Sequence, residues 1–133
     1  MIEWFEKNRV FSVILFVLIA VEIFFFSSIT GKVSGPWTGL KVSMTYHFSV
    51  FFLLNFFLMV SLNGGKNEKE KNGVKIKYLI IAAIFSVVYS LLDEIHQLFV
   101  PFRYADLRDI LTNNAGIFLS ILVYTYSKNS WKH

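Results

Sequence analysis

Residues 89–116 place acidic, basic, imidazole and amide side chains between two apolar segments. The stretch reads YSLLDEIHQLFVPFRYADLRDILTNNAG. Carboxylates and imidazoles can transfer protons or bind metal ions, and a guanidinium can bind an anionic oxygen with two parallel hydrogen bonds. Ionisable groups beside membrane segments are costly and usually mark a working site. We therefore treat this stretch as the candidate functional region.

The candidate catalytic residues in this region are Glu94, His96, Arg103 and Asp109. We expect His96 or Glu94 to move a proton and Arg103 to bind an anionic oxygen of the substrate. Two structural roles for Arg103 stay open beside this one. It can anchor to lipid headgroups, or it can pair with Asp106 or Asp109.

Helical spacing divides the polar residues between faces. Tyr89, Asp93, His96 and Gln97 share one face through i, i+3 and i+4 relations, whereas Glu94 points about 100° away. Asp93 and Glu94 are therefore not a facing pair, and we expect one to face the bundle while the other meets water or Arg103. The candidate substrate-binding residues are Glu22, His47, Asp93, Gln97 and Asn113.

A second line of residues follows the same region. Asp109, Asn113 and Gly116 lie at i, i+4 and i+7, and Asp109 suits the start of a helix, where the dipole favours a carboxylate. Gly116 would allow a neighbouring helix to come close. Asn55, in the middle of an apolar segment, is better interpreted as a hydrogen bond between helices than as a site residue.

The elements that must position these residues are apolar helices. Of the 133 residues, 55% are hydrophobic, and they form blocks at residues 10–29, 43–62, 78–98 and 110–126. About 20 apolar residues span the roughly 30 Å hydrocarbon core of a bilayer. The sequence thus predicts an all-α integral membrane bundle of four transmembrane helices in one domain, residues 1–133. A cleaved signal peptide is the alternative for the first block, but this block exceeds the usual apolar length of about 7–15 residues and contains Glu22.

Polar segments separate the blocks and indicate the orientation. Residues 31–41 are rich in Gly and Pro, residues 63–77 are rich in lysine, residues 127–133 form a basic tail, and Pro101 should stop or kink the third helix. Most lysines and arginines fall on the side of the termini and the lysine-rich loop, which places both termini in the cytoplasm. The polar residues of four segments then converge on the extracytoplasmic side of a multi-pass cell-membrane protein.

Composition excludes several classes of function. The chain has no cysteine, which rules out disulfides and thiolate metal sites. Its net charge of +4 lies in loops beside apolar blocks, so we expect no nucleic-acid partner.

A divalent metal ion is one possible cofactor, and its presence stays unknown at this stage. His47 and His96, with one or two of the carboxylates, would suit zinc or a similar ion, but no HExxH-type spacing supports it. The other hypothesis is metal-free acid–base chemistry on a lipid-linked phosphate or related headgroup. The residues leave both open.

The run DEIHQLFVPFR, followed by Asp109, Asn113 and Gly116 at D-x3-N-x2-G spacing, resembles the VanZ-like family of small membrane proteins. Phe25-Phe26-Ser27-Ser28 at the end of the first block, and Lys41 with His47 at the second, support the resemblance. One departure is Phe102, where relatives commonly carry Gly before the Arg, so the turn at residues 101–103 is expected to differ.

The resemblance implies an association with resistance to lipoglycopeptides such as teicoplanin. We accordingly expect a protein that binds or modifies an envelope lipid or lipid-linked molecule in its polar pocket. Two alternatives are a non-enzymatic binder that masks the drug's membrane target and a small transport or assembly subunit. Whether the protein is an enzyme stays undecided by the sequence.

Overall fold

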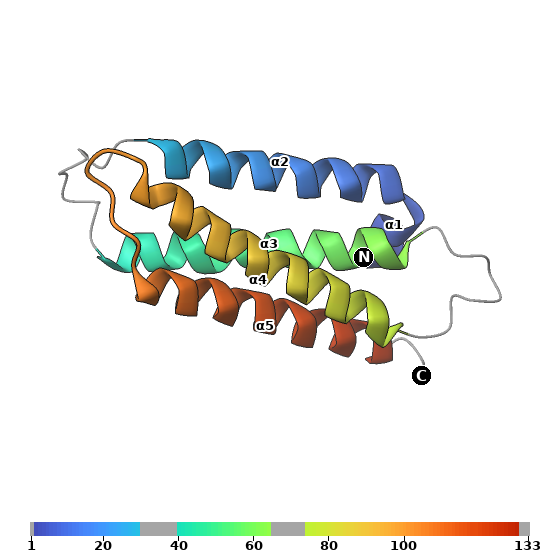
Figure 1. The fold of residues 1–133 in the computed structure, drawn as a ribbon. Helices are drawn as coiled ribbons and strands as arrows, with labels where there is room; N and C mark the ends of the chain where they lie inside the picture. Colours follow the sequence, from blue (N-terminus) through green and yellow to red (C-terminus); the bar gives the residue numbers. More distant parts are fainter. Residues whose placement is uncertain (1, 30–39, 65–73, 131–133) are drawn as a thin grey trace.

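The fold is described from a computed structural model, which defines residues 2–29, 40–64 and 74–130. All regular elements in these ranges are α-helices: α1 (Ile2–Lys7), α2 (Arg9–Ser28), α3 (Leu40–Asn63), α4 (Ile76–Leu98) and α5 (Leu107–Ser130). The four long helices run side by side in alternating directions (Figure 1). The all-helical prediction is confirmed.

Each predicted block corresponds to one long helix, with different bounds. The fourth differs most, because α5 begins at Leu107 and continues to Ser130 through part of the predicted tail. Residues 2–7, which precede the first predicted block, form α1. Most of the two predicted loops, residues 30–39 and 65–73, lies outside the described residues.

Three helices are long and apolar enough to cross a membrane: α2, the described part of α3 from Met44 to Asn63, and α4. The fourth long helix, α5, is not among them. Its polar side chains Asn113 and Ser120 are fully buried, whereas Phe118 and Leu122 face outward. Part of the low hydropathy of α5 therefore comes from polar residues turned into the bundle, and part comes from residues such as the exposed Arg108.

The distribution of side chains is that of a membrane bundle, with polar groups inside and large apolar groups outside. Polar residues that are buried tend to join helices to one another in such bundles. The buried polar residues in the described part of this chain are Ser12, Ser27, His47, Asn55, Ser61, Asn63, Ser86, Ser90, Asp93, Glu94, Gln97, Asn113 and Ser120. Long apolar side chains such as Leu18, Ile84 and Phe118 are exposed along the helices, where lipid tails would cover them.

Asn55 ties three helices together at the middle of the bundle. Its Nδ2 donates to Ser120 Oγ of α5 at 2.7 Å, and its Oδ1 accepts from Ser86 Oγ of α4 at 3.1 Å. The prediction of an interhelical hydrogen bond is confirmed.

At Gly116 the helix α5 lies directly against the backbone of α3. A Cβ atom built on Gly116 would collide with the backbone carbonyl of Phe48, and it would lie 3.1 Å from the amide nitrogen of Phe52. Only a residue without a side chain fits there, so the predicted role of Gly116 is confirmed. This close packing fixes the position of α5 along the axis of α3.

Specific residues define where α4 ends and where α5 begins, on either side of the turn between them. The helix α4 ends at Leu98, before Pro101, which cannot continue it. Asp106 then begins α5, because its Oδ1 accepts the backbone N–H of Arg108 at 2.8 Å, as an N-cap residue does. Asp109 accordingly lies in the first turn of α5, as predicted.

Candidate functional site

The polar residues gather at the end of the bundle where α2 and α4 finish and α3 and α5 begin (Figure 1). This is the end opposite α1 and the last turn of α5, which Glu6 and Lys128 join through a 2.7 Å ion pair. His47 comes from α3, Glu94 from α4 and Asp109 from α5. Three segments that are distant in the sequence thus contribute to one site.

His47 is the central residue of this site and is 5% exposed. Its Nε2 lies 3.5 Å from Oδ2 of Asp109, and its Nδ1 lies 3.1 Å from Oδ1 of Asn113. The amide of Asn113 is oriented in turn, because its Nδ2 donates to Ser90 Oγ at 2.8 Å. Since an amide oxygen only accepts, this orientation assigns a proton to Nδ1 of His47.

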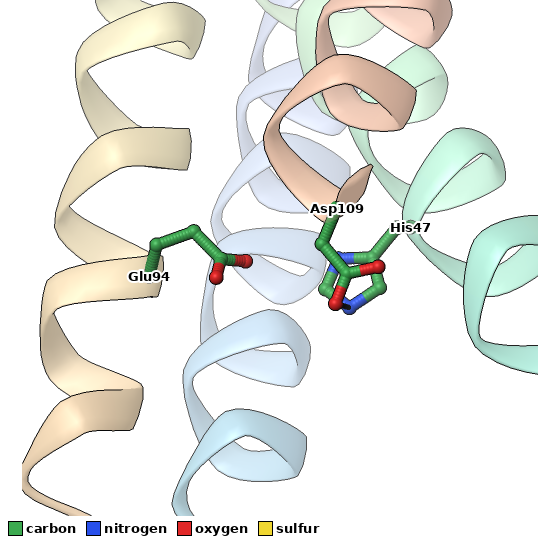
Figure 2. Close-up of side chains that lie close together, drawn as sticks. All are labelled: His47, Glu94 and Asp109. Atoms are coloured by element: carbon green, nitrogen blue, oxygen red, sulfur yellow. Dashed lines mark ion pairs between the residues drawn. The ribbon is translucent and has the colours of Figure 1, made fainter. Parts of the chain in front are cut away.

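Glu94 faces His47 and Asp109 from α4, and its side chain points at the pair (Figure 2). The residue is only 2% exposed. Its Oε2 accepts the backbone N–H of Asp106 at 3.0 Å, whereas its buried Oε1 has no hydrogen-bond partner among the described residues. One ligand atom from each of His47, Glu94 and Asp109 can be chosen so that all three lie within 4.8 Å of one another.

Asp93 lies beside this group with a different set of contacts. Its Oδ2 accepts from Gln97 Nε2 at 3.2 Å, and Gln97 Oε1 accepts from Arg103 Nη1 at 3.4 Å. Both Asp93 and Glu94 are buried, so neither carboxylate meets water as one alternative had it. Asp93 reaches Arg103 through Gln97, and the two neighbouring carboxylates serve separate networks.

Arg103 is held by the end of α2. Its Nη2 donates to the carbonyl of Phe26 at 2.7 Å, and its Nε donates to the carbonyl of Ile29 at 3.1 Å. Carbonyls at a helix C-terminus lack partners in the helix, and an arginine side chain can satisfy them. In this arrangement Arg103 fastens the α4–α5 turn to α2.

His96 lies on the α2 side of α4, apart from His47. Its Nε2 is 3.0 Å from Ser28 Oγ, and its ring lies 4.8 Å from that of Phe24. Glu22 is exposed on α2. The two remaining candidates, His96 and Glu22, are therefore not part of the three-residue group around His47.

Two residues of this region were not selected from the sequence. Ser90 orients Asn113, and its position four residues before Glu94 is the helical spacing that could have indicated it. Tyr46, next to His47, buries a hydroxyl that has no partner among the described residues. Nothing in the sequence around Tyr46 distinguishes it from the other aromatic residues of α3.

The arrangement provides a buried imidazole and two carboxylates, and one carboxylate oxygen has no hydrogen-bond partner in the described part of the chain. Such a group can exchange a proton with a bound molecule or hold a cation. Its burial and its density of ionisable groups are typical of functional sites.

The comparisons with known proteins agree with the resemblance noted in the sequence. The family model described as VanZ/LLP1 matches residues 11–128. This range includes α3 and α4 and nearly all of α2 and α5, but not α1. No curated protein and no solved structure matches the chain. The three apolar helices and this match together indicate a membrane protein. Since the match covers most of the sequence, the chain belongs to the VanZ/LLP1 family.

Proposed function

We propose that this protein binds or modifies the headgroup of an envelope lipid, or of a lipid-linked molecule, at the polar end of its bundle. The observation that carries the proposal is the carboxylate of Glu94. It is buried at the end of the membrane bundle, it faces His47 and Asp109, and one of its oxygens has no partner among the described residues. An unsatisfied buried polar group costs about 1–3 kcal/mol, which a bound molecule would offset.

The proposal includes the placement of the site in the cell membrane. We infer four spans, because α3 and α5 have 24 residues each and α5 buries Asn113 and Ser120 in the bundle. Both termini then lie in the cytoplasm, since most lysines and arginines fall on that side. The His47 site opens toward the outer leaflet, where lipid headgroups and lipid-linked cell-wall molecules lie.

The family suggests the biological consequence. By its resemblance to VanZ-like proteins, the chain would lower the susceptibility of a bacterium to teicoplanin and similar lipoglycopeptides. Occupation or modification of an outer-leaflet headgroup is a direct way to do so, because these drugs act at that surface.

Comparison of lipids from four strains tests the proposal. Three strains express the wild type, Glu94→Gln or Asp106→Asn, with equal amounts of protein in the membrane, and the fourth carries the empty vector. Asp106→Asn is the matched control, because it removes a neighbouring carboxylate whose side chain caps α5, and asparagine caps a helix as well as aspartate. Lipid extracts and lipids that co-purify with the protein are analysed by mass spectrometry.

We expect a lipid species that is altered or enriched with the wild type and with Asp106→Asn, and that returns to the level of the empty vector with Glu94→Gln. A species altered in the extract indicates an enzyme, and one enriched only on the purified protein indicates a binder. Identical lipid profiles for the wild type and Glu94→Gln would refute the proposal.

A further inference from the structure

The group formed by His47, Glu94 and Asp109 has the composition of a metal site. An imidazole nitrogen and carboxylate oxygens are ordinary ligands of zinc and related divalent ions. Each of the three residues comes from a different helix, and each is at least mostly enclosed by the bundle. Rigid helices hold such ligands more accurately than loops do.

The distance between His47 and Asp109 fits two ligands of one ion better than it fits a hydrogen bond. A charge-assisted N–H···O bond is about 2.7–2.9 Å long, whereas Nε2 and Oδ2 are 3.5 Å apart. Two ligands at about 2.1 Å from a tetrahedral zinc ion lie roughly 3.4 Å from each other. The observed separation is close to that value.

The contacts behind these residues also match those of a metal site. Metal-binding histidines usually donate their second ring N–H to an oxygen, which fixes the ring and its tautomer. Nδ1 of His47 makes this contact with Asn113, which Ser90 orients. The backbone N–H of Asp106 likewise holds Oε2 of Glu94 and leaves Oε1 for a ligand. These contacts leave Oε1 of Glu94, which has no hydrogen-bond partner among the described residues, available to an ion.

The charges of the three side chains provide an independent reason to expect an ion between them. With its proton on Nδ1, a neutral His47 presents the lone pair of Nε2 to the carboxylate of Asp109, which is unfavourable unless a proton or a metal ion lies between them. A proton between them would satisfy this pair, but it would give no partner to Oε1 of Glu94, which has none among the described residues. A divalent ion satisfies all three side chains together.

We propose that His47, Glu94 and Asp109 bind one divalent metal ion of the zinc class. Three protein ligands leave at least one coordination position open for an outside oxygen. The ion would also neutralise the two carboxylates and offer its open position to an oxygen of an anionic lipid headgroup. This last step rests on the proposed function, whereas metal binding itself does not.

The test uses the full-length protein in detergent, treated with a chelator and then supplied with Zn²⁺. Metal content is measured by mass spectrometry after desalting, and affinity is measured by calorimetric titration. The wild type should hold one equivalent of zinc, and His47→Gln and Asp109→Asn should bind about ten-fold more weakly or worse. The control, His96→Gln, should bind like the wild type, since His96 contacts Ser28 and Phe24 on the α2 side of α4.

A second readout does not depend on the folding of any variant. X-ray absorption of the wild type with bound zinc should show one imidazole nitrogen and at least two oxygens as ligands. Substoichiometric zinc in the wild type would overturn the proposal, and so would equal binding by all variants or an absorption spectrum with two or more imidazoles. If lipid profiles respond to Glu94→Gln but no metal binds, only this inference fails. If one zinc ion binds but lipid profiles do not respond, only the proposed function fails.

Discussion

His47 and Asp109 join α3 to α5, with Nε2 of the imidazole 3.5 Å from Oδ2 of the carboxylate. The pair is possible only because α5 approaches α3 very closely at Gly116, about two turns further along. The packing of small residues and the geometry of the polar site are thus parts of one arrangement.

We predict that Gly116→Ala destabilises the protein by about 1–3 kcal/mol, because the added methyl group collides with backbone atoms of α3 that cannot move aside. A lower midpoint of thermal unfolding in detergent would report this loss. Ala115→Leu is the control, since Ala115 is exposed on the same helix. Equal midpoints for Gly116→Ala and the wild type would show that the helices are not in such close contact.

Phe102→Gly should stabilise the protein. Phe102 has a φ angle of 63°, in the left-handed region that costs a side-chain-bearing residue about 1–2 kcal/mol and glycine almost nothing. Phe102 is 65% exposed, so most of its side chain lies outside the packed interior. The thermal midpoint should rise, whereas Tyr104→Gly in the same turn should not raise it; a fall with Phe102→Gly would contradict the explanation.

Arg103→Lys should act on stability before it acts on function. Lysine has one terminal nitrogen and cannot reproduce the separate hydrogen bonds that Nε and Nη2 make to Ile29 and Phe26. We expect a loss of about 1–3 kcal/mol and a lipid effect that falls only with the amount of folded protein. Arg108→Lys, at an exposed position, should leave the thermal midpoint unchanged. A stable Arg103→Lys protein with no lipid effect would instead support direct binding of an anionic substrate by Arg103.

The inferred topology can be tested with single cysteines, because the natural chain has none. Tyr104→Cys places a thiol on the α4–α5 turn, where Tyr104 is 83% exposed. A membrane-impermeant maleimide should label it in intact cells. Glu3→Cys, on α1 at the opposite end, should be labelled only after the membrane is opened. The reverse pattern would place the His47 site in the cytoplasm.

The sequence allowed prediction of the helices and of their polar end, because long apolar blocks and helical spacing are local properties. It allowed prediction of the role of Gly116 for the same reason. The length of α5 was underestimated, since its last residues are polar and carry no apolar signal. The partners of Arg103 and His96 were not predictable, because both depend on where the end of α2 lies against α4. The pairing of His47 with Asn113 and Asp109 likewise depends on the position of α5 along the axis of α3.

The susceptibility of a teicoplanin-sensitive bacterium tests the central claim, that the group around Glu94 is the working site. The strain expresses the wild type, Glu94→Gln or Asp106→Asn at equal membrane levels, and the inhibitory concentration is measured for each. We predict that the wild type and Asp106→Asn protect the cells, whereas Glu94→Gln returns them to the level of the empty vector. Equal protection by Glu94→Gln would show that the buried carboxylate is structural and would contradict the account.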